Sequence, residues 1–145
     1  MTDLFERAAQ WIAHDPDPAT RAELKTLVER ARKDNAARAQ LAERFVGPLE
    51  FGTAGLRGVI GAGESLMNRA VVRRTAAGMA RYLLAQRTGG DSGPASGPAS
   101  VRTSGVVIGY DGRRLSRELA EDTAAVLAAH GILRSWPHTR CRRPW

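Results

Sequence analysis

The sequence predicts an α/β fold that is preceded by a helical N-terminal segment, and three observations lead to this prediction. Apolar side chains recur at helical spacing between residues 4 and 44. Residues 51–63 then contain five glycines in thirteen positions, a density too high for a packed strand or helix. Farther along, residues 106–110 form a short β-branched run followed by a helical stripe, as in a covered α/β strand and its helix.

The N-terminal segment begins with two predicted helices. In the first, apolar residues fall at positions i, i+4, i+7 and i+8, which are Leu4, Ala8, Trp11 and Ile12. Pro16 and Pro18 must end this helix, because proline cannot continue its hydrogen-bond pattern. The second helix is expected to start at Thr20, which fits a capping box with Glu23. Its apolar face consists of Leu24, Leu27, Val28 and Ala31.

A third, weaker helix is expected at residues 36–44, before Gly47-Pro48 breaks the helical pattern. After the glycine-rich segment, Asn68 is expected to cap a helix that ends near Gln86. Its core stripe consists of Val71, Val72, Thr75, Ala76, Met79, Tyr82 and Leu83. A tandem Ser-Gly-Pro-Ala repeat then predicts a flexible surface insert at residues 88–104.

Residues 106–110 are expected to form a strand that is covered on both faces. Residues 111–114 turn the chain, and Ser116 is expected to cap the following helix, with Gly131 at its C-terminal end. The predicted core face of this helix consists of Leu119, Thr123, Val126, Leu127 and His130. Residues 133–145 are rich in arginine, proline and tryptophan, and we expect no strand there.

Length and composition exclude several classes of protein. The 145 residues correspond to about one average domain, with 43% hydrophobic and 26% charged residues, so the whole chain is neither disordered nor a coiled coil. No apolar run is long enough to span a membrane and no secretory signal is present, so we expect a cytoplasmic protein without a membrane partner. The single Cys141 excludes an internal disulfide, and scattered histidines make a poor metal cluster, so no metal ligand is assigned.

The positive charge does not indicate a nucleic-acid partner. The formal net charge is +7, but four arginines and no acid lie in residues 133–145, which leaves +3 for residues 1–132. Elsewhere arginine and glutamate alternate, as in Glu29-Arg30 and Glu43-Arg44, a pattern typical of a solvated helix face. A basic protein that binds nucleic acid is therefore the weakest interpretation.

The glycine-rich segment has the chemistry of an anion site. No Gly-Lys-Ser/Thr follows it, and its glycines do not match a dinucleotide fingerprint, so neither route to nucleotide binding is expected. Glycines around Thr53 and Arg57 let backbone N–H groups approach an anion, and Arg57 offers a permanently charged fork that suits phosphate. The alternative is that the glycines only make tight turns and that Arg57 pairs with a carboxylate.

Three motifs carry a resemblance to a known family. They are Glu50-Phe-Gly-Thr-Ala-Gly-Leu-Arg-Gly58, the pair Met67-Asn68 before a helix, and Val107-Ile-Gly-Tyr-Asp-Gly-Arg113 with a downstream Ser116. Together they resemble the opening of an α-D-phosphohexomutase, and the preceding helices are most similar to the phosphoglucomutase and phosphopentomutase branch. The resemblance, over roughly residues 5–132, implies part of an α/β first domain with a mixed sheet and flanking helices.

The resemblance also implies an activity and roles for individual residues. Family members are isomerases of carbohydrate metabolism, intramolecular phosphotransferases that move a phosphoryl group on a phosphosugar substrate through a phosphoserine and a bisphosphorylated intermediate, with Mg²⁺. A glucose 1,6-bisphosphate-type activator is implied as well. Arg57 matches the arginine of the family's Gly-Thr-x-Gly-x-Arg segment and is the candidate catalytic residue. Thr53, Gly55 and Gly58 shape its loop.

Asp111 and Arg113 end a predicted strand at its carboxyl edge, where sites of α/β proteins tend to lie. The resemblance gives these two residues a supporting role. The alternative, which the residue types favour, is an ion pair that fixes the loop.

Other parts of the family's machinery are absent from these 145 residues. The Thr-Ala-Ser-His-Asn-Pro segment with the nucleophile, the Asp-Gly-Asp-x-Asp metal loop and the sugar-recognition loop do not occur. We therefore expect no mutase turnover from these residues alone, with the Mg²⁺ ligands missing. The expected organisation is a helical segment at 1–46, an incomplete domain I at 47–132 and an aberrant tail at 133–145 that a frameshift near Ile132 would explain.

Two hypotheses about the chain itself stay open. The first is the N-terminal part of a phosphosugar mutase that is inactive by itself. The second is a small domain that uses the Arg57 loop to bind a sugar phosphate or a partner without catalysis.

Overall fold

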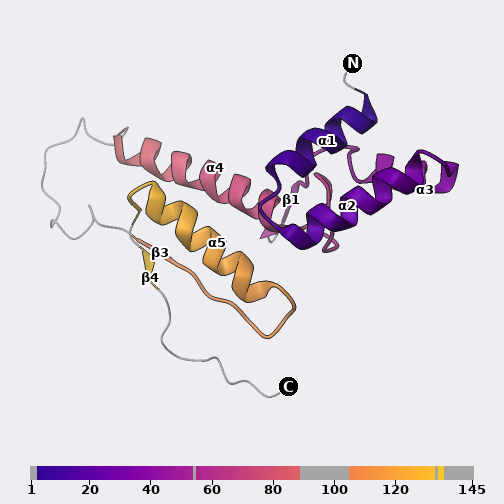
Figure 1. The fold of residues 1–145 in the computed structure, drawn as a ribbon. Coiled ribbons are helices and arrows are strands. Elements are labelled where there is room, and N and C mark those ends of the chain that lie inside the picture. Colours follow the sequence, from indigo (N-terminus) through magenta and orange to yellow (C-terminus); the bar gives the residue numbers. More distant parts are fainter. Residues whose placement is uncertain (1–2, 54, 89–104, 133, 136–145) are drawn as a thin grey trace, which may run out of the picture. The chain divides into compact units, whose positions relative to one another are not determined.

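The structure is a computed structural model that describes residues 3–53, 55–88, 105–132 and 134–135 (Figure 1). Residues 89–104 of the predicted insert, and the predicted basic tail apart from residues 134 and 135, lie outside the described residues. The chain divides into two compact units, Met1–Val72 and Arg73–Trp145, and each is considered by itself.

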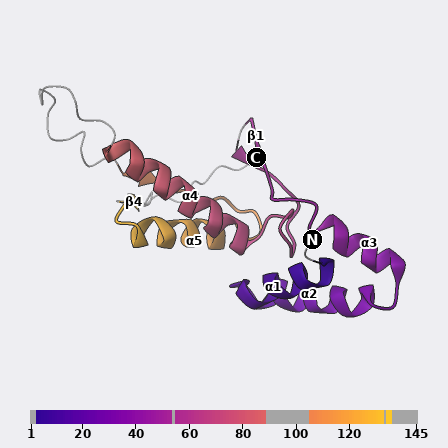
Figure 2. The same cartoon turned by 90° about the horizontal axis from the view of Figure 1, so that it is seen from above.

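Three helices build most of the first unit: α1 (Leu4–His14), α2 (Pro18–Ala31) and α3 (Asn35–Glu43). The helix α2 contacts both α1 and α3, and Figures 1 and 2 show α1 alongside α2. Buried side chains of this unit form one apolar core, which consists of Ala8, Leu24, Leu27, Ala31, Ala37, Leu41, Phe45 and Ala62. The predicted N-terminal helices and the predicted apolar face of the second helix are therefore confirmed.

The start of α2 differs from the predicted capping box. Asp17 is the N-cap residue, because its carboxylate accepts a hydrogen bond from the backbone N–H of Ala19 at 2.9 Å. Pro18 begins the first turn, where a missing N–H costs nothing. The Thr20 hydroxyl donates instead to the buried carboxylate of Asp15 at 2.7 Å. Thr20 therefore stabilises the connection between α1 and α2, and the prediction that it caps the helix is wrong.

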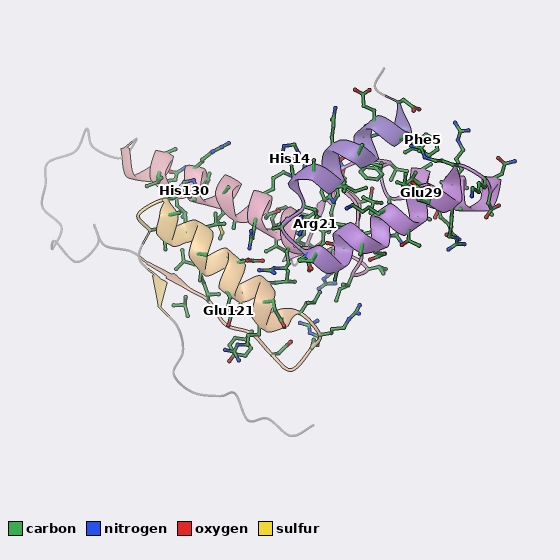
Figure 3. The ribbon with its side chains drawn as sticks, viewed as in Figure 1. Phe5, His14, Arg21, Glu29, Glu121 and His130 are labelled. Carbon is green, nitrogen blue, oxygen red and sulfur yellow. The ribbon has the colours of Figure 1, made fainter. Side chains whose placement is uncertain are left out.

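One end of the helical core is closed by an aromatic and arginine cluster. The guanidinium carbons of Arg32 and Arg38 lie 5.3 and 5.5 Å from the centre of the Phe5 ring. Figure 3 shows Phe5 near the N-terminal end of α1, beside the part of α2 that carries Glu29. These cation–π contacts join the ends of α2 and α3 to α1.

Residues 58–68, which we call the glycine loop, pack against these helices. Ala62 is fully buried and belongs to the helical core. The Nη1 of Arg44 donates to the carbonyl oxygen of Ala62 at 3.0 Å, and the Nη2 of Arg7 donates to Oε2 of Glu64 at 3.2 Å. Ala62 lies in the core, and Arg7 of α1 and Arg44 at the C-terminal end of α3 bind the loop. The glycine loop and the helices therefore form one structural unit.

A small hairpin precedes the glycine loop. The strands β1 (Phe51–Gly52) and β2 (Gly55–Leu56) pair antiparallel, with Phe51 opposite Leu56 and Gly52 opposite Gly55. Gly55 has a φ of +100°, which residues with a side chain rarely adopt. The Phe51 side chain is largely exposed, so the hairpin is not a packed strand pair, as the glycine density predicts.

Most of α4 (Arg69–Thr88) lies in the second unit, together with β3 (Val106–Val107), α5 (Ser116–Ala129) and β4 (Arg134–Ser135). Figures 1 and 2 both show α4 next to α5. The Nη2 of Arg73 on α4 donates to the buried carboxylate of Asp122 on α5 at 2.6 Å. The apolar core of this unit consists of Ala80, Ile108, Ala120, Ala124, Leu127 and Ile132.

The strand expected at residues 106–110 is shorter and less covered than predicted. The pairing of β3 with β4 is parallel, with Val106 opposite Arg134 and Val107 opposite Ser135. Val107 is 74% exposed, whereas Ile108 is buried, so the prediction of a strand covered on both faces is wrong. The prediction that no strand follows Ile132 is also wrong, because strand pairing uses backbone N–H and C=O groups that every non-proline residue carries.

The start and the buried face of α5 also correct the sequence analysis. Leu115, with a φ of +62°, is the N-cap residue, and Ser116 does not cap the helix but accepts a hydrogen bond from the Asp111 N–H. Leu127 is buried, as predicted, but the other buried α5 residues are Ala120, Asp122 and Ala124. The predicted core residues Leu119, Thr123, Val126 and His130 are only half-buried. Ala120 and Ala124 of α5 share this core with Ala80 of α4, and their small side chains let the two helices pack closely. Close packing of α4 and α5 therefore determines which face of α5 is buried.

The described strands and helices confirm the α/β class. An antiparallel pair lies in the first unit and a parallel pair in the second, each with helices of its own unit. Across the described residues, no helix combines the length and the apolar character that a membrane span requires.

Candidate functional site

The candidate site centres on the hairpin and on the residues that follow it. Thr53 lies in the turn between β1 and β2 and is exposed. Gly55 opens β2 with its positive φ, so the turn requires a residue without a side chain at that position. The hairpin therefore presents its turn to solvent, directly before the segment that carries Arg57.

Arg57 follows β2 and is exposed. Within the described part of the chain, the structure gives Arg57 no hydrogen bond and no ion pair, unlike Arg7, Arg44 and Arg73. The ion pair with a carboxylate that the alternative interpretation requires is thus not seen among these residues. A solvated guanidinium of this kind is available to an anionic ligand.

Gly58 sets the path of the chain immediately after Arg57. A Cβ at this position would lie 2.9 Å from Cδ1 of Leu49 and 3.6 Å from the backbone nitrogen of Met67. The backbone therefore passes close to Leu49 and to the end of the glycine loop, which only a glycine allows without movement of the Leu49 side chain.

Asn68 is the polar centre of the glycine loop and is 1% exposed. Its Nδ2 lies 2.9, 2.8 and 3.1 Å from the carbonyl oxygens of Gly61, Gly63 and Leu66, so two N–H groups share three acceptors. Its Oδ1 accepts a hydrogen bond from the backbone N–H of Val71 at 3.0 Å, which confirms the predicted cap of α4.

The sequence analysis identified Asn68 as a helix cap and missed its contacts with the loop. A cap requires an acceptor oxygen, and serine, threonine or aspartate would supply it equally well. The signal that could have been used is the choice of asparagine, because its amide alone among these side chains adds two N–H donors beside a glycine-rich segment.

Asp111 and Arg113 lie in the second unit, at the turn before α5. The backbone N–H of Arg113 donates to Oδ1 of Asp111 at 3.0 Å, and its Nε donates to Oδ2 at 2.8 Å. These two hydrogen bonds, the backbone one first, lower the pKa of the Asp111 carboxyl below its ordinary value. The structure thus contains the ion pair that the alternative interpretation of these two residues describes.

The part of the chain that the structure describes contains no group of three or more His, Cys, Asp and Glu side chains that could hold a metal ion. Two acidic side chains of the family-motif region are in ion pairs, Glu64 with Arg7 and Asp111 with Arg113.

Comparison with known families gives one match over most of the chain. Residues 48–136 match the family described as "Phosphoglucomutase/phosphomannomutase, alpha/beta/alpha domain I". The match includes the hairpin, the glycine loop and the turn before α5, and therefore every candidate residue described above.

Curated relatives point to the same group of proteins. A phosphoglucomutase of Staphylococcus aureus (strain MRSA252) is 41% identical over 97 residues, which are 67% of this chain and 15% of that protein. The phosphoglucomutase of strain COL is 40% identical over the same shares of both chains. The chain thus spans about 15% of the length of the curated relatives that it matches. No solved structure matches the chain.

Proposed function

Since the chain belongs to the phosphoglucomutase/phosphomannomutase family through domain I, we propose that it is part of a phosphosugar mutase. Such an enzyme is an isomerase of carbohydrate metabolism that moves a phosphoryl group between position 1 and the terminal hydroxyl of a sugar. The observation that carries the proposal is the exposed guanidinium of Arg57, for which the described residues supply no acidic partner.

In this proposal Arg57 is the catalytic residue of the chain and binds oxygens of the migrating phosphoryl group. A guanidinium presents a planar fork of N–H donors that matches two phosphoryl oxygens at once. During phosphoryl transfer negative charge is spread over the equatorial oxygens, and a fixed cation neutralises it there. Arg57 can act in this way because no carboxylate of the described residues already neutralises it.

The other candidate residues support this arrangement. Thr53 and Gly55 form the turn of the hairpin, and Gly58 allows the close passage of the backbone beside Leu49. Backbone N–H groups of such small-residue turns approach a phosphate closely. Asp111 and Arg113 stabilise the turn before α5 through their ion pair.

Family members use Mg²⁺ and a phosphoserine, and neither can be assigned to residues of this structure. The described residues do not fit a metal ion, so no step is assigned to one. The family's Thr-Ala-Ser-His-Asn-Pro segment does not occur in the 145 residues. In the proposed reaction the nucleophile and the metal ligands therefore belong to other parts of the enzyme.

A titration followed by nuclear magnetic resonance tests the role of Arg57. Glucose 1-phosphate added to the chain should shift the Nε–H signal of Arg57, because its phosphate binds the guanidinium. Glucose at the same concentrations should leave this signal unchanged. In Arg57→Ala the backbone shifts of the glycine loop caused by glucose 1-phosphate should disappear, and in Arg57→Lys they should weaken because the fork is lost.

The matched control is Arg30→Ala, which removes an exposed arginine of α2 that lies outside the family match. This variant should respond to glucose 1-phosphate as the unsubstituted chain does. Equal responses of Arg57→Ala and the unsubstituted chain would exclude Arg57 as a phosphate ligand.

The second candidate function is a sugar-phosphate-binding domain without catalysis. It is favoured by one observation, namely that the hairpin and the glycine loop lie in a unit with an apolar core of its own. Calorimetry with glucose 1,6-bisphosphate separates the two functions. Tight, stoichiometric binding to the 145 residues supports the binding domain, whereas weak binding that depends on Arg57 supports a part of a mutase.

A further inference from the structure

Asn68 connects the glycine loop to the start of α4 through a single buried side chain. Its Nδ2 faces the carbonyl oxygens of Gly61, Gly63 and Leu66, and its Oδ1 accepts from the N–H of Val71. The polar atoms of this side chain are therefore satisfied by backbone groups of one loop and one helix. A buried amide that is satisfied in this way has one strongly preferred orientation.

The carbonyl oxygens bound by Asn68 belong to a loop whose two ends are paired. The Met67 N–H donates to the carbonyl oxygen of Val59 at 2.8 Å, and the Gly61 N–H donates to that of Met67 at 3.1 Å. Ile60 and Met67 form a parallel bridge between these bonds. Residues 59–61 and Met67 thus form the stem of the glycine loop, and Asn68 follows that stem directly.

The stem also fixes the direction of the chain that precedes it. Gly58 is held between Leu49 and Met67, where a Cβ would lie 2.9 Å from Leu49 and 3.6 Å from the Met67 nitrogen. Arg57 is the next residue toward the N-terminus. A change in the stem would therefore move Gly58 and, through it, the backbone of Arg57.

On this basis we infer that Asn68 is a positioning residue, which holds the stem of the glycine loop closed and thereby directs Arg57 toward its phosphate ligand. The inference rests on the proposed function of Arg57. It adds a residue that acts through Arg57 and does not itself contact the ligand. In this inference Asn68 acts through the contacts of its Nδ2 with the three carbonyl oxygens, and not through the hydrogen bond that caps α4.

The substitution Asn68→Asp separates the two roles of the side chain. Aspartate keeps an acceptor for the Val71 N–H and is an equally good N-cap, so α4 should stay helical. It has no N–H donor, so its carboxylate faces three carbonyl oxygens without a hydrogen bond. The amide hydrogens of Gly61 and Met67 should then exchange with solvent at least about tenfold faster, because the stem opens.

Ser65→Ala provides the matched control. The Ser65 hydroxyl is half-buried and donates to the carbonyl oxygen of Gly47 at 2.7 Å, so its loss removes one hydrogen bond from the same loop at a point outside the stem. A merely structural effect on the loop should appear in both variants. A positioning effect should change the Nε–H signal of Arg57 in Asn68→Asp alone.

The experiment measures three quantities in each chain: amide exchange at Gly61 and Met67, the Arg57 Nε–H signal without ligand, and its shift with glucose 1-phosphate. We expect Asn68→Asp to show fast exchange, a changed Arg57 signal and binding of glucose 1-phosphate weaker by about tenfold. Ser65→Ala should match the unsubstituted chain in all three. Unchanged exchange and an unchanged Arg57 signal in Asn68→Asp would overturn the inference.

The result also distinguishes this inference from the proposed function. If glucose 1-phosphate leaves the Arg57 signal of the unsubstituted chain unchanged, the proposed function fails. In that case the ligand-free signal of Arg57 still decides whether Asn68 positions it. If both variants change that signal equally, the loop as a whole determines the Arg57 conformation and the specific role of Asn68 is excluded.

Discussion

At Gly63 the backbone conformation and the packing both exclude a larger residue. Its φ is +119°, and a Cβ would lie 2.8 Å from both Cβ and the backbone oxygen of Arg44. These two Arg44 atoms belong to the start of a side chain and to the backbone, and neither can move without moving the end of α3. The glycine therefore lets the glycine loop lie directly on the helical core.

Gly63→Ala should lower the free energy of unfolding by about 1–3 kcal/mol, because an alanine there is strained and meets Arg44. Urea unfolding followed by circular dichroism measures this change. Gly47→Ala is the control, since nothing lies within 4 Å of its Cβ position and its φ is not positive. A Gly63→Ala variant as stable as Gly47→Ala would contradict the loop conformation described above.

The Asp111 carboxyl provides a second test at the scale of a single residue. The backbone N–H of Arg113 is the first cause of its lowered pKa, and the Arg113 side chain is the next. The pKa of Asp111 is lower in the folded chain than in the unfolded chain. Ionised Asp111 therefore stabilises the folded state at pH values above its unfolded pKa. This stabilisation is lost as the pH falls through the folded value.

Arg113→Ala should therefore raise the pKa of Asp111 part of the way toward its ordinary value, and not fully, because the backbone N–H at position 113 remains. Carboxyl carbon chemical shifts followed over an acid titration measure this pKa. Full return to the ordinary value would show that the side chain is the main cause. Both groups are exposed, so we expect no measurable loss of global stability in this variant at neutral pH.

Single residues were predictable from the sequence where the chemistry is local. The cap at Asn68 and the positive φ of Gly131 follow from residue types at a helix end. The donor contacts of Asn68 and the burial of Ala62 were not predictable, because they depend on how the glycine loop folds back on distant residues. The roles of Arg57 and of the other candidate site residues stay predictions.

Among the helices, α2 offers a test of capping with an internal control. The Asp17 carboxylate accepts a hydrogen bond from the Ala19 N–H, whereas Asp3 occupies the N-cap position of α1 without any side-chain cap bond. Asp17→Ala should therefore lower the free energy of unfolding by about 1 kcal/mol. Asp3→Ala should change it much less, since no cap hydrogen bond is lost.

Urea unfolding of the two variants beside the unsubstituted chain measures the difference. If Thr20 were the true cap, as its sequence pattern suggests, Asp17→Ala would be nearly neutral. Because the Thr20 hydroxyl also binds the buried Asp15 carboxylate, a Thr20→Ala change would not distinguish the two models.

The positions of helices were predicted better than those of strands, for a physical reason, although Met79 and Tyr82 of the predicted core stripe of α4 are exposed. Apolar spacing such as that of Leu24, Leu27 and Ala31 reports on one face of a helix, whose hydrogen bonds are all local. The pairing of β3 with β4 places Val106 opposite Arg134, and the residues around Arg134 show no local pattern that predicts a strand. On α5 the periodicity of large apolar side chains predicts Leu127 correctly but not Ala120 and Ala124, whose small side chains allow close packing.

For the whole molecule, the sequence identified the family because its motifs are short and contiguous. The match over residues 48–136 confirms that resemblance. The attachment of the glycine loop to the helical core could not be predicted, since it depends on contacts such as Arg44 with Ala62 and Arg7 with Glu64. The predicted division of the chain at residue 47 and the predicted frameshift stay predictions.

The last prediction concerns catalysis by the chain as given. We expect the 145 residues alone to convert no glucose 1-phosphate into glucose 6-phosphate, because a phosphoserine cannot form without the serine segment and the described residues do not fit a metal ion. A coupled assay with added Mg²⁺ and glucose 1,6-bisphosphate measures this, beside a sample without protein. Turnover above that blank, lost in Arg57→Ala, would show that these residues contain a complete catalytic site and would overturn the proposal that they are one part of it.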